Sequence, residues 1–386
     1  MTTVLFAHDG YILSTNEGIY SDAYNNKIVE RYFNIADNVV FLVRTRPSDS
    51  QYQMLNKINV KNFNIESVEN FKTLKGILKY HAVIDIVKQK VQKSDYIIAR
   101  IPSDLGYLAA LYAKFYKKRY LVEVVGCPWD SYNNHSICGK LIAPYYYLIQ
   151  KKIVKRAPYA VYVTNEFLQS RYPCMGKSIS CSDVEIENMD EAVLARRIKK
   201  IKASDMNQLV FGTLGPLNMK YKGYDTVIKA IAKLNSEGYS YKYCIVGSGD
   251  PSWLSSIIHK YYANSFVKIL PSMPHKKVFE WLDSIDIYVQ PSKTEGMPRA
   301  LIEAMSMGVP SIGSNIGGIP ELLGNLLIFK RSSAKGLSKC ILNITKDELE
   351  RTGKENFYKA TKYTNTILEK RRTDFYKLFT FDESSQ

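Results

Sequence analysis

Short apolar runs rich in β-branched and aromatic residues alternate along the chain with longer segments of helical period. In the first half, the runs with strand character are residues 4–7, 39–43, 96–101, 120–125 and 160–163. Segments between them, such as 83–91 and 105–115, place apolar residues three and four positions apart. This spacing predicts amphipathic helices.

The same alternation continues through the second half. The predicted strands are residues 209–212, 242–246, 267–270, 285–289, 309–312 and 326–329, and the predicted helices are 225–235, 252–261, 275–282 and 299–307. Strict alternation of strand and helix is typical of parallel sheets covered by helices on both faces. Two such series predict an α/β fold of two Rossmann-like domains that face each other across a cleft. Ligands of such sheets bind beyond the carboxyl ends of the strands.

The length of 386 residues suits two domains of ordinary size. We assign residues 1–187 to an N-terminal Rossmann-like domain and 207–355 to a C-terminal Rossmann-like domain. The polar, charged segment 188–206 is predicted to link them. Residues 356–380 are predicted to form a final helix, and its return to the N-terminal domain stays open.

The strongest chemical signal is the motif PSKTEGMPRALIEAM, in which Glu295 and Glu303 stand eight positions apart. Pro298 suits the first position of a helix, where its missing N–H is not needed. Gly296 and Met297 then offer free amides at a helix amino terminus, which favours a phosphate group. One carboxylate could reach sugar hydroxyls and the other a ribose. Alternatively, these are an ordinary loop glutamate and an ordinary helix glutamate.

Small and basic residues follow the other strands of the second half. They are Gly212, Thr213 and Gly215, then Lys220 and Lys222, and finally Gly247 and Gly249. Glycine after a strand lets the backbone approach a bound group closely, and a lysine neutralises a diphosphate as a point charge. By itself, a Gly-x-Gly pair is more typical of a tight turn.

The order of these motifs, FGTLG, KYKGYD, VGSG, EGMPRALIEAM and GGIPE, resembles the retaining GT-B glycosyltransferases of family 4, the group 1 glycosyl transferases. The resemblance covers about residues 208–325 and the whole set is specific. The N-terminal half resembles the family only in its fold pattern. A capsule or O-antigen enzyme is the type that the resemblance implies.

Roles for single residues follow from the resemblance. It implies that Glu303 binds the ribose, that Glu295 contacts the donor sugar, and that Lys222 stabilises the departing diphosphate. It also assigns Gly296, Met297 and Pro298 to the sugar and phosphate pocket, Gly247 and Gly249 to close packing of the nucleotide, and Ser272, Met273 and Pro274 to the base. Many members carry an arginine where this chain has Thr213, so whether Lys220 replaces that charge stays open.

The resemblance also implies the reaction. A hexose-type sugar leaves a nucleoside diphosphate, which we expect to be UDP, with its anomeric configuration retained. The departing phosphate takes the acceptor proton, so no dedicated base is required. No Asp-x-Asp motif follows a strand. We therefore expect no metal and no cofactor, the nucleotide sugar being a co-substrate.

Candidate acceptor residues follow strands of the first half. Trp129 could stack on a sugar, and Asp130 or His135 could orient a hydroxyl. The alternative for the last two is a turn cap and a surface histidine. Asp9 and Gly10, after the first strand, are weaker candidates for the same pocket.

The formal charge of +16 favours anionic partners. Residues 71–119 hold eleven Lys and Arg against three Asp, a net +8, and 140–156 hold five basic residues and no acid. The aromatic stretch 143–149 leads into this second basic cluster, which suits an anionic membrane surface. A buried helix and a merely solvated cationic face are the alternatives. We expect a glycan or polyprenyl-diphosphate-linked acceptor.

Targeting and redox signals are sparse. The first residues lack the pattern of a signal peptide, and no apolar run reaches the roughly 18 residues of a membrane span. Six scattered cysteines without a Cys-x-x-Cys pair predict reduced thiols. These features predict a cytoplasmic protein, peripheral on the inner face of the membrane.

Two other functions fit parts of the sequence. A nucleotide-sugar 2-epimerase shares the fold but needs no acceptor, and it would convert the donor when incubated with the donor alone. A nucleic-acid-binding protein would explain the positive charge. However, the basic runs lack interleaved stacking aromatics and a groove-reading module.

Overall fold

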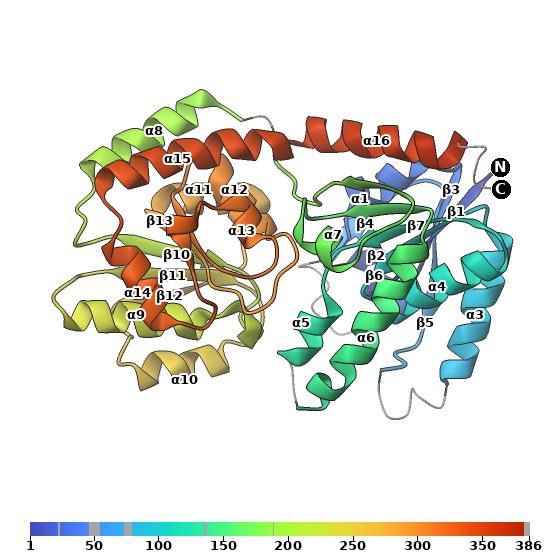
Figure 1. Cartoon of the computed structure of the whole chain (residues 1–386), viewed down its shortest axis with the longest axis horizontal. Helices are drawn as coiled ribbons and strands as arrows, with labels where there is room; N and C mark the ends of the chain where they lie inside the picture. Colours follow the sequence, from blue (N-terminus) through green and yellow to red (C-terminus); the bar gives the residue numbers. More distant parts are fainter. Residues whose placement is uncertain (22–23, 46–54, 73–78, 135–136, 188, 382–386) are drawn as a thin grey trace. The chain divides into compact units, whose positions relative to one another are not determined.

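The computed structural model describes residues 1–21, 24–45, 55–72, 79–134, 137–187 and 189–381. By its internal contacts the chain divides into two compact units. The first comprises Met1–Trp129, Pro144–Cys181 and Glu369–Gln386, and the second comprises Asp130–Ala143 and Ser182–Leu368. Each unit has its own sheet covered by helices (Figure 1).

The sheet of the first unit is mainly parallel. Its parallel strands run in the order β5 (Phe63–Val68), β3 (Asn38–Thr45), β1 (Thr3–Thr15), β6 (Tyr96–Ile101), β7 (Arg119–Val124), β8 (Tyr159–Tyr162) and β9 (Lys177–Ser180). The far end of β1 pairs antiparallel with β2 (Gly18–Ser21), which pairs with β4 (Asn56–Ile58). Between Ala7 and Tyr11 the register of β1 shifts. The predicted strand 4–7 is therefore only the first part of a longer strand, and Asp9 and Gly10 lie inside its irregular middle.

Helices cover both faces of this sheet. They are α1 (Asn26–Glu30), η1 (Arg31–Asn34), α3 (Tyr80–Lys93), α4 (Asp104–Phe115), α7 (Phe167–Arg171) and the later turns of α6 (Ile137–Arg156). Most of α5 (Pro128–Asn133) and the first turns of α6 belong to the segment Asp130–Ala143 of the second unit. Figure 1 shows α3, α4 and α6 on one side of the sheet and α1 on the other. Ser103 caps α4, because its side chain accepts a hydrogen bond from the amide of Gly106.

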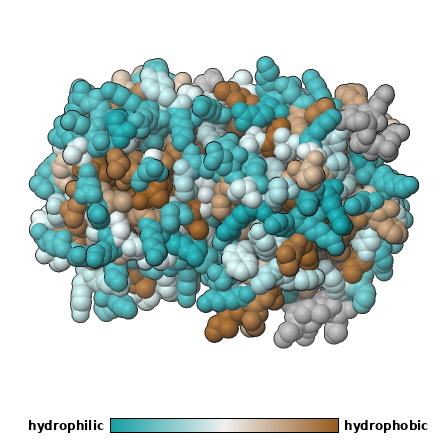
Figure 2. Space-filling model, in the orientation of Figure 1, coloured by the Kyte–Doolittle hydropathy of each residue, from teal (hydrophilic) through white to brown (hydrophobic). Residues whose placement is uncertain are grey.

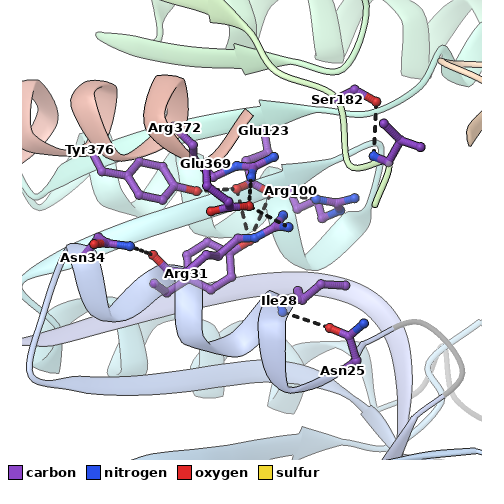
Figure 3. Close-up of polar contacts among 12 residues, drawn as sticks. Asn25, Ile28, Arg31, Asn34, Arg100, Glu123, Ser182, Glu369, Arg372 and Tyr376 are labelled. Atoms are coloured by element: carbon purple, nitrogen blue, oxygen red, sulfur yellow. Dashed lines mark hydrogen bonds and ion pairs between the residues drawn. The ribbon is translucent and has the colours of Figure 1, made fainter. Parts of the chain in front are cut away.

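The last helix, α16 (Asn365–Phe381), packs its final turns on the first unit. Phe379 contacts Tyr96 and Tyr159 edge to face. Tyr376 donates to the buried Glu123 of β7 at 3.2 Å, and Arg100 of β6 pairs with the same carboxylate at 2.8 Å (Figure 3). A buried charge held by several donors thus fastens the end of the chain to this sheet.

The sheet of the second unit is wholly parallel. Its strands run in the order β12 (Val267–Pro271), β11 (Lys242–Gly247), β10 (Val210–Leu214), β13 (Ile287–Gln290), β14 (Ser311–Ser314) and β15 (Ile328–Phe329). All six predicted strands of this half are present, shifted by one or two residues at most ends. The apolar runs of β10, β11, β13 and β14 are largely buried, as in other parallel sheets, whereas the edge strand β12 is half-exposed.

Two helical layers cover the second sheet. The elements are α8 (Glu191–Ala203), η3 (Lys220–Lys222), α9 (Tyr224–Ser236), α10 (Ser252–Lys260), α11 (His275–Ser284), α12 (Arg299–Ser306), α13 (Ile319–Leu322), η4 (Asn325–Leu327), α14 (Ala334–Leu342), α15 (Lys346–Ala360) and η5 (Thr361–Tyr363). Figure 1 shows α9 and α10 on one side of the sheet and α11, α12 and α15 on the other.

The predicted linker 188–206 contains α8, which packs into the second unit. The guanidinium of Arg197 is buried and donates to the carbonyl oxygens of Ile285 at 2.6 Å and Leu282 at 2.7 Å. The predicted final helix is two helices, since α15 ends at Ala360 and α16 begins at Asn365. Among the described residues, no helix has the length and hydropathy needed to cross a bilayer.

Candidate donor site and candidate acceptor residues

The order of strands in the second unit marks one place for a ligand. Strands β10 and β13 are neighbours, with β11 and β12 beyond β10, and β14 and β15 beyond β13. The chain therefore winds in opposite directions from this central pair. In such sheets a crevice opens at the carboxyl ends of the two central strands, where the connections diverge.

A cluster around Glu295 lies after the carboxyl end of β13. Lys222 Nζ lies 2.9 Å from Glu295 Oε2. The same oxygen accepts hydrogen bonds from Ser292 Oγ at 2.9 Å and Gln290 Nε2 at 3.2 Å. Lys222 comes from the segment after β10, so the two central strands each supply one member of the ion pair. Sequence reasoning did not single out Gln290 and Ser292.

The turn after η3 fixes Lys222 in this position. Gly223 has a φ of 77°, and a Cβ there would lie 2.1 Å from the carbonyl oxygen of Pro291. Only glycine fits such a conformation and so close an approach. In addition, the amide of Lys293 donates to the carbonyl oxygen of Tyr221 at 2.6 Å. The lysine segment and the glutamate loop are thus joined through their backbones.

Both members of the ion pair are largely buried, each with 15% of its side chain exposed. Burial disfavours the charged ammonium of Lys222, but the Glu295 carboxylate outweighs it and raises the lysine pKa. Lys222 is therefore a permanent cation at neutral pH. A buried cation at the end of two strands is suited to an anionic ligand.

The glycine loops give the backbone room at the same edge. Gly247 ends β11, and a Cβ on it would lie 1.9 Å from the carbonyl oxygen of Gly215. Gly249 has a φ of 104° and approaches Asn218. These glycines hold the ends of β10 and β11 closer than any side chain would permit.

Helix α12 begins after the glutamate loop. Pro298 is its N-cap and not its first helical residue, a difference of one position. The segment after β14 holds the glutamate loop in place, because the amide of Gly318 donates to the carbonyl oxygen of Gly296 at 2.7 Å. Met297 and Pro298 are buried beside it. The N-cap of the helix thus comes three positions after Glu295, and Gly296 and Met297, which were predicted to offer amides at the helix start, precede it.

Glu303 lies in the same helix, is 9% exposed, and has a partner that sequence reasoning missed. His275 Nε2 lies 3.4 Å from Glu303 Oε1. A hydrogen bond to Glu303 raises the pKa of His275 against the opposing effect of burial. His275 is the first residue of α11 and follows the exposed or half-exposed loop of Ser272, Met273 and Pro274. The predicted base and ribose residues are therefore joined through His275.

Three predicted donor residues have other surroundings. A Cβ on Gly212 would meet Ile285 at 2.6 Å, so this glycine serves packing inside the sheet. The buried Thr213 donates to the carbonyl oxygen of Val289 and accepts from the hydroxyl of Tyr243, both at 2.8 Å. Its side chain faces the core. The ammonium of Lys220 lies 5.7 Å from the centre of the Trp253 ring, and not beside Thr213.

In the first unit, Asp9 is tied to α4. Its two oxygens accept from the amides of Asp104 at 2.9 Å and Leu105 at 3.0 Å, and Lys72 Nζ lies 2.6 Å away. Burial opposes its charge, but Lys72 and these amides outweigh burial and lower the pKa of Asp9. The predicted acceptor carboxylate thus completes the amino terminus of a helix.

His8, which sequence reasoning missed, lies directly before Asp9. Its Nδ1 accepts from the amide of Gly10 at 3.1 Å and contacts the hydroxyl of Tyr24 at 2.5 Å. Desolvation and Arg100 lower its pKa to about 3, so the ring is neutral. Because Nδ1 accepts from the amide of Gly10, the proton of the neutral ring is assigned to Nε2. A Cβ on Gly10 would collide with the Tyr24 hydroxyl at 2.3 Å, which explains that glycine. The only signal in the sequence was its place next to Asp9.

The remaining acceptor candidates lie on α5 or after it. Trp129 is 36% exposed and contacts Tyr147 edge to face, with ring centres 6.0 Å apart. Asp130 is buried, and its carbonyl oxygen accepts from the side-chain amide of Asn134 at 2.7 Å. His135 lies outside the described residues. Trp129 therefore keeps an exposed ring for stacking, whereas Asp130 is enclosed.

Comparisons with known proteins bear on both units. The family model of the glycosyl transferases group 1 matches residues 195–362. Protein CapJ of Staphylococcus aureus is 32% identical over 341 residues, which cover 88% of this chain and 85% of CapJ. An amylovoran biosynthesis glycosyltransferase, AmsK of Erwinia amylovora, is 31% identical over 139 residues, 33% of this chain and 34% of AmsK.

Solved structures resemble the whole chain. HepE of Anabaena, solved in complex with UDP and glucose, has a TM-score of 0.64 at 14% identity and covers 97% of this chain and 99% of its own. WaaG, a glycosyltransferase involved in lipopolysaccharide biosynthesis, has a TM-score of 0.63 at 12% identity, covering 98% and 100%. These similarities identify the predicted GT-B fold.

Proposed function

The chain belongs to the glycosyl transferases group 1 family, and we propose from this premise that it moves a hexose-type sugar from a nucleoside diphosphate to a glycan or lipid-linked acceptor. The observation that carries the proposal is the Lys222–Glu295 pair after the two central strands. It joins a buried cation for the diphosphate to a carboxylate for the sugar in one place. The amino terminus of α12 begins after Pro298, three positions beyond Glu295, and adds its dipole to the positive side.

The reaction develops negative charge on the departing diphosphate and positive charge on the sugar ring. Lys222 and the start of α12 stabilise the first, as a preorganised electrostatic site. An arriving diphosphate competes with Glu295 for the ammonium of Lys222. The released carboxylate is then available to the hydroxyls of the sugar. Glu303, held by His275, takes the ribose hydroxyls in this proposal.

The proposal includes retention of the anomeric configuration and independence from metal. The departing phosphate accepts the proton of the acceptor hydroxyl on the face from which it leaves, so the chain supplies no dedicated base. Lys222 and the helix amino terminus provide the positive charge that a metal ion provides in other transferases. HepE, a structural neighbour, binds UDP-glucose, which supports a UDP-linked donor here.

The acceptor side is proposed from chemistry and relatives together. AmsK acts in amylovoran biosynthesis, which supports a role in surface polysaccharide synthesis. Within the first unit, Trp129 offers an exposed ring for a sugar, and the neutral His8 offers an N–H donor. The basic residues of this unit suit a polyprenyl-diphosphate carrier, so we place the protein in the cytoplasm, peripheral on the inner membrane face.

A transfer assay tests the proposal. The protein is incubated with membranes that carry lipid-linked acceptors and with radiolabelled UDP-, GDP-, ADP- or dTDP-sugars, and labelled glycolipid is extracted. We expect one donor to label the lipid fraction and Lys222→Ala to abolish the labelling. A donor that is epimerised without any acceptor, and never transferred, would instead identify a 2-epimerase.

A further inference from the structure

Helix α6 buries only one of its faces. The helix runs over Ile137–Arg156, twenty residues or about 30 Å. Ala143, Gln150, Ile153 and Val154 are buried, with 0–7% exposure. The side chain of Gln150 donates to the carbonyl oxygen of Gly126 at 2.9 Å. Together with the half-buried Tyr146 and Tyr147, these residues recur every three or four positions, so they define one inward face of the helix.

The outward face of the amino-terminal half is apolar. Ile137, Leu141, Tyr145 and Leu148 are 80, 78, 63 and 63% exposed. Their spacing of four, four and three residues places them in one stripe. Figure 2 shows brown surface at the lower edge of the molecule, where Figure 1 places the beginning of α6. Contiguous apolar surface of this kind marks a site of contact.

The outward face of the carboxyl-terminal half is basic. Lys151, Lys152, Lys155 and Arg156 are all exposed, and residues 140–156 contain no acid. Lys155 lies five turns after Ile137 on the same side of the helix. Within the described part of the chain, none of the four forms a salt bridge. One face therefore changes from apolar to cationic along its length.

The aromatic stretch 143–149, from which the sequence suggested membrane contact, divides between the two faces. Tyr146 donates to Asp104 at 3.0 Å, and Tyr147 packs against Tyr172 with ring centres 5.4 Å apart. These two tyrosines serve packing. The exposed stripe instead includes Ile137 and Leu141, which come earlier and which the sequence did not single out.

We propose that α6 is the membrane-docking element, with its apolar half inserted at the acyl boundary of an anionic bilayer and its basic half on the lipid headgroups. This proposal rests on the proposed function, because that function requires an acceptor carried by the membrane. An anionic bilayer offers an apolar layer and negative charge side by side, which matches both halves. A second copy of the chain matches neither arrangement: parallel helices would join two basic halves, and antiparallel helices would set each basic half on an apolar one.

Cosedimentation with vesicles tests the surface. We expect the full chain to bind phosphatidylglycerol–phosphatidylcholine vesicles and to bind pure phosphatidylcholine far more weakly. Lys151→Glu with Lys155→Glu should lower the partition coefficient by at least about thirty-fold, at about five-fold for each lysine lost. Leu141→Glu should lower it at least about ten-fold. The control for the lysine pair is Lys229→Glu with Lys335→Glu, at two exposed lysines of the second unit. The control for Leu141→Glu is Leu326→Glu, because Leu326 is 70% exposed.

The direction of insertion has its own measurement. Leu141→Trp and Lys155→Trp each add one indole to opposite halves of the outward face. With vesicles of brominated phosphatidylglycerol, we expect quenching of the added emission for Leu141→Trp and little for Lys155→Trp. Equal quenching of both would contradict the proposed arrangement of the two halves.

The outcome separates this proposal from the assignment of the reaction. Vesicle binding that is absent, or that is unchanged in the α6 variants, overturns the docking surface. A dimer of the free protein that dissociates in Leu141→Glu would also overturn it, by assigning the stripe to a second copy. UDP-induced thermal stabilisation, measured without vesicles, reports on the donor site alone and is expected to stay the same in every α6 variant.

Discussion

Lys222 and Glu295 are 73 positions apart in the sequence and form an ion pair with 2.9 Å between Nζ and Oε2. The pair joins the connection after β10 to the connection after β13, the two central strands of the second sheet. Before a donor arrives, each buried charge thus neutralises the other. In the proposed reaction a diphosphate replaces the carboxylate at the lysine, and Glu295 keeps the hydrogen bonds from Ser292 and Gln290.

Loss of the ammonium should reduce turnover far more than it affects folding. Lys222→Ala removes the cation nearest the proposed leaving group, and we expect kcat to fall about 100- to 1,000-fold. Glu295→Gln keeps the size of the side chain but removes its charge, and we expect a similar loss. Initial rates at saturating donor measure both. Lys229→Ala, on the exposed side of α9, is the control, and an equal loss in that variant would contradict a specific role for Lys222.

The ends of β10 and β11 lie so close together that a side chain at Gly247 should disturb them. Gly247→Ala places a Cβ 1.9 Å from the carbonyl oxygen of Gly215, so the end of one strand must move. We expect a lower melting temperature and loss of UDP-induced stabilisation. Gly324→Ala is the matched control, because its Cβ meets nothing within 4 Å. If Gly247→Ala bound nucleotide as well as the control, the close strand ends would not be part of the donor site.

The His275–Glu303 contact predicts a pH dependence. The pKa of His275 is raised above its ordinary value of 6.5, so the folded chain holds this proton more tightly than the unfolded chain. The contribution of the pair to stability is complete below pH 6.5 and is lost as the pH rises through the raised pKa. Melting temperatures between pH 5.5 and 9 should therefore show a lead of the wild type over His275→Gln that declines with pH. A lead that grew with pH would contradict the assignment.

The Glu123 cluster should govern the attachment of α16. Glu123→Ala leaves Arg100 and the hydroxyls of Tyr32 and Tyr376 without their common acceptor, which costs about 3–5 kcal/mol. Tyr376→Phe removes one hydrogen bond and should cost about 1 kcal/mol. Urea unfolding measures both. Equal stability of the two variants would show that the carboxylate is not the centre of the cluster.

Much of the fold follows from the sequence because the strands of both sheets are continuous apolar runs. Residues 96–101 were predicted with the bounds that β6 has. The edge strands of the first sheet were missed: β5, for example, is a short, half-exposed segment, FNIESV, without an apolar run. Helix α8 was read as a linker because its basic residues conceal a buried stripe that includes Leu194, Arg197 and Ile201.

The candidate site was predictable as a set of motifs but not as a set of contacts. Glu295 and Glu303 lie in one contiguous motif, eight positions apart, so they can be identified without knowing which residues surround them. The pleat of β10 decides toward which face of the sheet Thr213 points. In the structure its hydroxyl points into the core, where it donates to the carbonyl oxygen of Val289. The partner of Glu303, His275, comes from another helix and has no motif.

Calorimetric titration of the full chain with UDP-, GDP-, ADP- and dTDP-sugars tests the central claim most directly. The account predicts that one of these donors binds with one site per chain, and that Lys222→Ala and Glu303→Ala each weaken it about ten-fold or more. The account is contradicted if none of the four binds, or if both variants bind the donor as tightly as the wild type.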